Sequence, residues 1–169
     1  MKGYIQVYTG DGKGKTSAAL GLAVRALGRG KRVCIVQFMK GMETGELLFF
    51  AQIPGIVIKQ FGSGKFVSAA GDEEKKLAGE ALEFAREQML SGNFDIIILD
   101  EVNVALHMHL LDVKTMMEFL REKPESVELV LTGRNAPQEI LEVADLVTEM
   151  REVKHYYRKG ILAREGIEY

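Results

Sequence analysis

The chain has 169 residues, which suits a single domain spanning residues 1–169 that can bury a core without metals or disulfides. Its 24 acidic residues slightly outnumber its 22 basic residues, and this balance argues against nonspecific nucleic-acid binding, which needs a concentrated basic surface. The single cysteine excludes an internal disulfide and a multi-cysteine zinc site, and with no signal-peptide core or membrane-length apolar run the expected location is cytoplasmic.

The first part of the chain predicts a strand, a glycine-rich loop, a helix and a second strand. Residues 4–8 form a short β-rich run that leads directly into the loop. Apolar residues then recur at helical spacing from about Lys15, and Gly28 is the expected end of the helix. Residues 32–37 (RVCIVQ) have four consecutive apolar residues at their centre without alternation, which predicts a strand buried on both faces with Cys34 as a small buried hydrophobe. This β-loop-α-β unit is typical of the start of a parallel sheet.

The rest of the chain continues the alternation of strands and helices. In the glycine-rich stretch 38–63 one strand is expected. The expected elements are a strand over 56–61, a helix from Gly71 to about Met89, a strand over 95–100, a helix over 111–121, a strand over 128–132, a short helix over 138–144 and a final core strand over 146–150. Their order predicts an α/β protein, a three-layer α/β/α fold with a mainly parallel central sheet.

Residues 8–17 (YTGDGKGKTS) contain most of a phosphate-binding loop. The standard pattern, G-x-x-x-x-G-K-[ST], ends here in Gly14, Lys15 and Thr16, between a strand and a helix as required. Thr9 stands where the first glycine belongs, and the nearest glycine comes one residue later. The loop glycines still allow the backbone to approach an anion closely. The predicted ATP-binding residues of the loop are Gly10, Asp11, Gly12, Lys13, Gly14, Lys15, Thr16 and Ser17.

Within this loop, Lys15 is expected to bind phosphate oxygens and the Thr16 hydroxyl to ligate Mg²⁺, with Mn²⁺ as a possible substitute. Lys13 adds a second positive charge that an ordinary loop does not need. The alternative is a glycine-rich turn between strand and helix that binds no ligand.

Two further segments are expected at the same edge of the sheet. Asp100 and Glu101 follow the most apolar strand, where a carboxylate can hold Mg²⁺ beside the loop. Thr16, Asp100 and Glu101 are therefore the predicted metal ligands, and Lys15, Thr16 and Glu101 the predicted catalytic residues. Arg134 follows another buried strand and is expected to contact triphosphate oxygens. The alternative for Asp100 and Glu101 is that they end the strand without binding a metal, and the alternative for Arg134 is a surface turn without a ligand.

Two other patterns predict no site of their own. His107 and His109, two residues apart on a helix, would point to nearly opposite faces, so the pair is not expected to bind a metal. Residues 154–159 (KHYYRK) interleave aromatic and basic side chains, as in some nucleic-acid-binding proteins. A solvated strand edge or a subunit contact is favoured for this short run.

The order and spacing of these motifs, over essentially the whole chain, resemble those of the P-loop corrinoid adenosyltransferases of bacterial vitamin B12 synthesis and salvage. That family acts on cob(I)alamin or cob(I)yrinic acid a,c-diamide. The segments that carry the resemblance are residues 10–16, 36–41, 99–101, 131–134, 144–145, 153–155 and 160–169.

The resemblance implies a RecA-like P-loop fold, usually a homodimer, and an unusual reaction. The reduced Co(I) of the corrinoid attacks the 5′ carbon of ATP, and the whole triphosphate leaves. In that family ATP lies reversed in the loop compared with its orientation in ordinary NTPases. We interpret Lys13 as an extra cation that suits this highly charged leaving group.

The resemblance also implies partners: ATP, a reduced corrinoid and a flavoprotein reductant, with no nucleic acid and no membrane. The corrin face is expected from residues 40–66. The family often has a tryptophan-containing aromatic segment there, and in this tryptophan-free chain Phe66 is the expected hydrophobic cover.

Two other functions remain open from the residues themselves. A small P-loop kinase or ATPase would use the same loop on the γ-phosphate of ATP. A nucleotide-dependent binding module would use the loop without catalysis and would contact its partner through the basic and aromatic residues 154–159.

Overall fold

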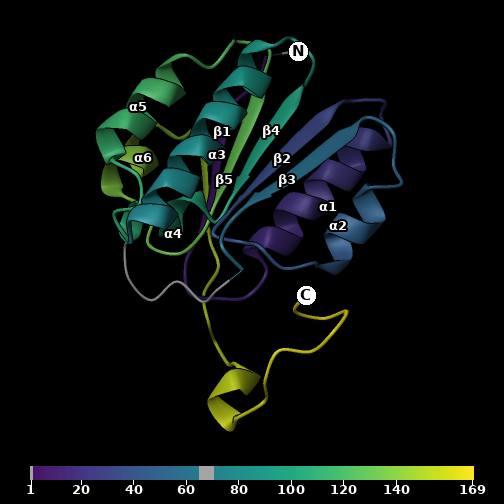
Figure 1. Cartoon of the computed structure of the whole chain (residues 1–169), viewed down its shortest axis with the longest axis vertical. Coiled ribbons are helices and arrows are strands. Elements are labelled where there is room, and N and C mark those ends of the chain that lie inside the picture. Colours follow the sequence, from purple (N-terminus) through teal and green to yellow (C-terminus); the bar gives the residue numbers. More distant parts are fainter. Residues whose placement is uncertain (1, 65–70) are drawn as a thin grey trace.

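The chain folds around a parallel β-sheet with helices on both faces (Figure 1). The computed structural model describes residues 2–64 and 71–169. Within these residues the sheet has six strands in the order β3-β2-β4-β5-β1-β6, and every pair is parallel. The strands are β1 (Ile5–Thr9), β2 (Val33–Phe38), β3 (Ile56–Phe61), β4 (Ile96–Asp100), β5 (Glu128–Thr132) and β6 (Leu146–Glu149). The predicted three-layer α/β/α architecture is confirmed.

The helices divide between the two faces of the sheet. One hydrophobic core contains side chains of α1 and α2, and the other contains side chains of α3, α4, α5 and α6. The bounds are α1 (Lys15–Leu27), α2 (Gly45–Phe50), α3 (Asp72–Leu90), α4 (Val102–His107), α5 (Val113–Arg121) and α6 (Gln138–Val143), and a 3₁₀ turn, η1 (Tyr156–Lys159), follows β6. No helix of the described ranges is long and apolar enough to span a membrane.

The central strands are mostly apolar because both of their faces pack against helices. All six residues of β2 are buried, and alternate residues enter opposite cores: Cys34 packs on the α3 side and Ile35 on the α1 side. Burial raises the pKa of the Cys34 thiol to about 12, so the thiol stays protonated and acts as a small hydrophobe, as predicted.

The expectation of a final core strand is wrong in one respect. β6 forms within the predicted range 146–150, but it lies at one edge of the described sheet, next to β1. All four of its residues are exposed, including Leu146 and Val147 at 44 % and 46 %. Apolar composition therefore identified the strand correctly, but it did not indicate that the strand lies at the edge of the sheet.

Two short helices, α2 and α4, were not among the expected elements, although the equally short α6 was predicted over 138–144. Six residues make fewer than two helical turns, so the helical repeat in such a segment is weak. The histidine interpretation also assumed a helix across both residues. Instead α4 ends at His107, and His109 has a left-handed backbone with φ 56°.

The parallel arrangement places the loops that follow β1, β2, β4 and β5 at the same edge of the sheet, the carboxyl edge. In open α/β folds ligands bind at this edge. The predicted site residues after β1, β4 and β5 therefore come together although other strands and helices separate them in the chain.

Candidate active site

A cavity of about 670 Å³ opens at the carboxyl edge of the sheet. This volume falls within the usual range for small-molecule sites. The cavity is lined by predicted residues from three separate loops, together with the C-terminal residues 166–169. The predicted residues among them are Gly12, Lys13, Gly14, Lys15, Thr16, Ser17, Glu101 and Arg134.

The glycine-rich loop turns sharply from β1 into α1. Gly10 and Gly14 have positive φ angles of 93° and 122°, which residues with a side chain rarely adopt, and Gly14 precedes the first turn of α1. The Lys15 side chain folds back into the loop, where its ammonium donates hydrogen bonds to Gly10 O at 2.7 Å and Gly12 O at 2.8 Å. Burial lowers the pKa of Lys15, and the nearby Glu101 carboxylate opposes that effect. Lys15 therefore lies at the base of the loop beside the cavity.

The segment that follows β6 packs directly on two of the loop glycines. Met150 O accepts a hydrogen bond from Gly12 N at 2.6 Å, and Met150 N donates to Thr9 O at 2.8 Å. A Cβ atom added at Gly10 or Gly12 would lie 2.5 Å or 2.7 Å from Met150 O. These two glycines are thus required by a contact within the protein, whether or not an anion is bound.

Thr9 also has a local reason to differ from glycine. Its side chain is buried, and its Oγ1 accepts a hydrogen bond from Ala136 N at 3.3 Å in the loop after β5. A glycine at this position would leave that backbone group without its partner. The position that departs from the standard pattern therefore connects the loops after β1 and β5.

Asp100 lies behind the loop and is almost completely buried, at 1 % exposure. Its Oδ1 accepts hydrogen bonds from the hydroxyls of Thr16 at 2.8 Å and Thr132 at 2.7 Å. Its Oδ2 accepts from Lys40 Nζ at 2.7 Å and Gln37 Nε2 at 3.1 Å. Both oxygens are already engaged, and Asp100 is not among the residues that line the cavity. Its visible role is to hold the hydroxyl of Thr16.

Glu101, the next residue, lines the cavity. Its backbone is left-handed with φ 64°, and its amide donates a hydrogen bond to Thr132 Oγ1 at 2.9 Å. Such a conformation costs about 1–3 kcal/mol in a residue with a side chain, and strain of this kind is common at functional sites. Burial raises the pKa of Glu101 and the Asp100 carboxylate adds to this, while Lys40 opposes it.

The oxygens of Thr16 and Glu101 are hard donors that suit Mg²⁺ or Mn²⁺. Mg²⁺ usually binds one or two protein ligands and completes its shell with water and substrate phosphates. No cluster of three or more His, Cys, Asp or Glu side chains with ligating geometry occurs in residues 2–64 or 71–169. The residues present therefore fit a metal that is shared with a phosphate chain.

Lys40 is a site residue whose position the sequence did not reveal. It was expected at the corrin face, yet its ammonium pairs with Asp100 and lies 3.7 Å from Glu46 Oε1 in the same cavity as the loop. Burial opposes the charge on Lys40, but the Asp100 carboxylate outweighs it and the pKa is raised. Only its place directly after β2 indicated that it would reach the carboxyl edge.

Arg134 lies at the rim of the cavity, half-exposed. Its guanidinium is 3.9 Å from Asp11 Oδ1 and donates to Asp11 O at 3.4 Å, which connects the loops after β5 and β1. The structure thus brings it to the site, as expected. Phe66, the expected corrin cover, lies outside the described residues.

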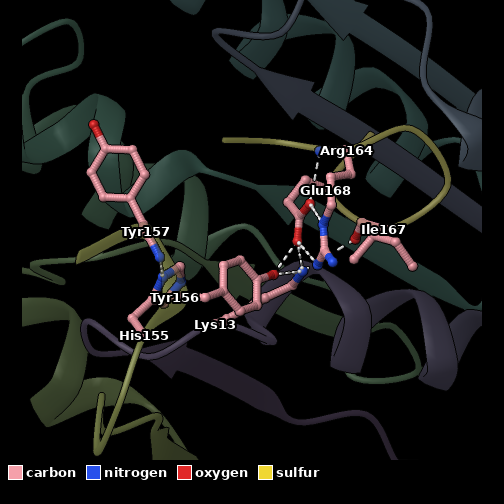
Figure 2. A network of polar contacts seen from close by, with 7 residues as sticks. All are labelled: Lys13, His155, Tyr156, Tyr157, Arg164, Ile167 and Glu168. Carbon is pink, nitrogen blue, oxygen red and sulfur yellow. Dashed lines mark hydrogen bonds and ion pairs between the residues drawn. The ribbon is translucent and has the colours of Figure 1, made fainter. Parts of the chain in front are cut away.

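Lys13 is engaged in a way that its sequence position did not indicate. Figure 2 shows its ammonium directed at the C-terminal segment, residues 155–169, where it contacts Tyr156 and Glu168. Tyr156 belongs to the basic and aromatic run 154–159, which was interpreted as a solvated edge or a subunit contact. At least this tyrosine contacts the loop of its own chain.

Comparison with known proteins adds an independent finding. The sequence profile of the family described as "ATP:corrinoid adenosyltransferase BtuR/CobO/CobP" matches residues 1–169. A corrinoid adenosyltransferase of a Sinorhizobium species is 40 % identical, and the alignment covers 99 % of this chain and 81 % of the relative. Corrinoid adenosyltransferases of Pseudomonas aeruginosa and Escherichia coli K12 are 36 % and 35 % identical, again over 99 % of this chain and over 84 % and 86 % of theirs.

The contact between Gly12 and Met150 predicts the effect of a single methyl group. Gly12→Ala should lower the free energy of unfolding by about 1–3 kcal/mol, because the new Cβ meets a backbone oxygen that cannot move aside freely. Urea denaturation measures the loss. Gly21→Ala is the matched control: Gly21 is an exposed residue of α1 with open space around it, and alanine there should stabilise by about 0.5–1 kcal/mol. Equal stability of Gly12→Ala and the wild type would contradict the packing argument.

Proposed function

Because this chain belongs to the ATP:corrinoid adenosyltransferase family, we propose that it transfers the 5′-deoxyadenosyl group of ATP to the Co(I) centre of a reduced corrinoid and releases triphosphate. The observation that carries the proposal at the level of residues is the meeting of Lys15, Thr16, Glu101 and Arg134 on one cavity large enough for a nucleotide.

The reaction needs little acid-base chemistry from the protein. The electron pair of Co(I) forms the bond to C5′, the bond between C5′ and its oxygen breaks, and the electrons leave with the triphosphate. Cobalt is thereby oxidised to Co(III), and no proton has to move. The protein contributes by aligning cobalt with C5′ and by stabilising the charge that gathers on the departing oxygens.

In our proposal the loop and its neighbours bind the triphosphate. Lys15, at the base of the loop, exchanges its two carbonyl partners for phosphate oxygens. Arg134 binds at the rim, where its half-exposed guanidinium offers a planar fork of donors that suits phosphate oxygens. The amides at the start of α1 add the positive end of a helix dipole.

Thr16 and Glu101 would hold the Mg²⁺ or Mn²⁺ ion. Bound there, the ion would neutralise negative charge on the leaving triphosphate. Asp100 was predicted as a metal ligand as well, but both of its oxygens already accept hydrogen bonds. In our proposal it instead orients the Thr16 hydroxyl so that a lone pair of that oxygen is available to the metal.

Further parts of the proposal rest on the resemblance to the family. They are a flavoprotein that reduces the corrinoid, a homodimer, a cytoplasmic location and no nucleic-acid partner. Phe66 stays the proposed cover of the corrin ring. Lys40 is proposed for the ATP side of the site because it pairs with Asp100.

One assay separates the proposed reaction from its alternatives. Incubation with ATP, Mg²⁺ and chemically reduced cobalamin should give the spectrum of adenosylcobalamin and one triphosphate per corrinoid. ADP with a phosphorylated acceptor would favour a kinase, and intact ATP would favour a binding module. ADP without adenosylcobalamin would falsify the proposal.

Lys15→Ala should lower kcat/KM for ATP by about 100-fold, because the variant loses the main cation of the loop. Steady-state kinetics measures the change, with a thermal melt to verify folding. Lys31→Ala is the control, since Lys31 pairs with Asp95 and does not line the cavity. If Lys15→Ala is as active as Lys31→Ala, the loop is not the ATP site.

Glu101→Gln should raise the Mg²⁺ concentration needed for half-maximal activity by about tenfold, because an amide is a poorer ligand than a carboxylate. The measurement is a Mg²⁺ titration at fixed ATP. Glu122→Gln, which changes an exposed partner of Arg86, serves as the control. An unchanged titration in Glu101→Gln would remove Glu101 from the metal shell.

A further inference from the structure

The C-terminal segment, residues 155–169, leaves the body of the protein after β6 and returns to the carboxyl edge of the sheet (Figure 1). It begins with η1, reverses direction at Gly160, whose φ is 80°, and continues to Tyr169. Its last residues, 166–169, line the cavity together with the phosphate loop. Two parts of the chain more than a hundred and fifty residues apart therefore share this site.

Lys13 is the residue of the loop that the segment contacts. Its ammonium donates hydrogen bonds to Tyr156 Oη at 2.9 Å, to Ile167 O at 3.2 Å and to the Glu168 carboxylate (Figure 2). A lysine ammonium has three N–H groups, and here all three have acceptors in the segment. Lys13 has no donor left for a phosphate oxygen while the segment is in place.

Glu168 is the centre of the contact on the side of the segment. Besides the bond from Lys13, its carboxylate accepts hydrogen bonds from the Tyr156 hydroxyl, from the Arg164 backbone N–H at 2.8 Å and from Arg164 Nε at 3.4 Å. The Arg164 guanidinium lies 4.8 Å from the centre of the Tyr156 ring. Lys13, through its hydrogen bond, holds the pKa of Glu168 far below its usual range, and Tyr156 reinforces this, so the carboxylate is charged at neutral pH.

The segment is a wall of the cavity rather than a plug. With residues 166–169 present, the cavity still measures about 670 Å³, which leaves room for a nucleotide. Lys15 makes a useful contrast with Lys13. It is buried, at 7 % exposure, and contacts only carbonyls of its own loop, which a phosphate can replace without moving another part of the chain.

We propose that Lys13 and Glu168 are positioning residues that tie the C-terminal segment to the phosphate loop, so that residues 166–169 form one wall of the site for a nucleoside triphosphate. This inference rests on the proposed ATP site. It replaces the expectation that Lys13 binds the triphosphate directly. The physical gain is preorganisation: a segment that is already ordered does not have to be ordered when the nucleotide binds.

The proposal predicts a particular split in the kinetics. Because Lys13 and Glu168 act through the wall and not on the reacting atoms, loss of either should raise KM for ATP and leave kcat nearly unchanged. The KM for the corrinoid should stay the same. A ligand of the leaving triphosphate would instead affect kcat, since it acts most strongly in the transition state.

A double-mutant cycle tests the tie directly. Lys13→Ala and Glu168→Gln should each weaken Mg·ATP binding, measured by calorimetry without corrinoid, by roughly fivefold. The double variant should bind no more weakly than either single variant, because both break the same contact. Additive losses, or a much larger loss in Lys13→Ala than in Glu168→Gln, would overturn the proposal.

Exchange of the two charges distinguishes a Lys13 that pairs with Glu168 from a Lys13 that binds phosphate directly. The double variant Lys13→Glu with Glu168→Lys re-forms the ion pair in reverse and should recover ATP binding compared with Lys13→Glu alone. If Lys13 binds the triphosphate directly, a carboxylate in the loop repels ATP whatever stands at position 168, and no recovery occurs.

Limited proteolysis reports the position of the segment itself. Trypsin should cleave after Arg164 faster in Glu168→Gln than in the wild type, and Mg·ATP should slow cleavage of the wild type. An equal cleavage rate in Glu168→Gln and the wild type would overturn the proposal, because the segment would then be held by other contacts.

Two controls keep this inference distinct from the proposed function. Lys76→Ala and Glu80→Gln remove an exposed pair of α3 outside the cavity and should leave ATP binding unchanged. Lys15→Ala should weaken ATP binding far more than either variant of the tie. If Lys15→Ala has no effect on ATP binding, the proposed ATP site is wrong. If Lys15→Ala weakens binding strongly but the losses of Lys13→Ala and Glu168→Gln are additive, only the proposed role of the C-terminal segment is contradicted.

Discussion

The buried carboxylate of Asp100 is the constraint on which the arrangement of the carboxyl edge depends. It accepts four hydrogen bonds. Two come from the hydroxyls of Thr16, next to the phosphate loop, and Thr132, at the end of β5; the other two come from Gln37 in β2 and Lys40 just after it. Burial of a charge is costly unless the charge is paired and hydrogen-bonded, so each of these partners is held in place by the need to satisfy Asp100. One side chain thereby connects α1, β5 and the end of β2.

This constraint also explains why Glu101 is free to face the cavity. Asp100 has consumed the donors that lie behind the loop, and the chain turns at once through a left-handed residue into α4. The backbone amide of Glu101 is anchored to Thr132, whose hydroxyl also donates to Asp100. Two adjacent acids thus have different environments and, in our proposal, different roles: one organises the protein and the other meets the metal.

Much of this could be predicted from the sequence because it depends on local pattern. The apolar runs of β2, β4 and β5 are buried on both faces, and the glycine loop stands between a strand and a helix, so the fold and the positions of Lys15, Thr16 and Glu101 followed. The exposure of β6, the place of Lys40 and the contact of Tyr156 with Lys13 did not follow. Each of these depends on which distant segment packs against the residue, and no periodicity or spacing within one sequence records that.

Contacts with distant segments also explain several residues of the phosphate loop, including the departure from the standard pattern at Thr9. Thr9 binds the loop after β5, Gly10 and Gly12 make room for Met150, and Lys13 contacts the C-terminal segment. These four positions of the loop therefore have partners elsewhere in the protein. Lys15 contacts carbonyls within the loop itself, and the Thr16 hydroxyl donates to Asp100. The specialisation of this loop therefore lies in how the rest of the chain is attached to it.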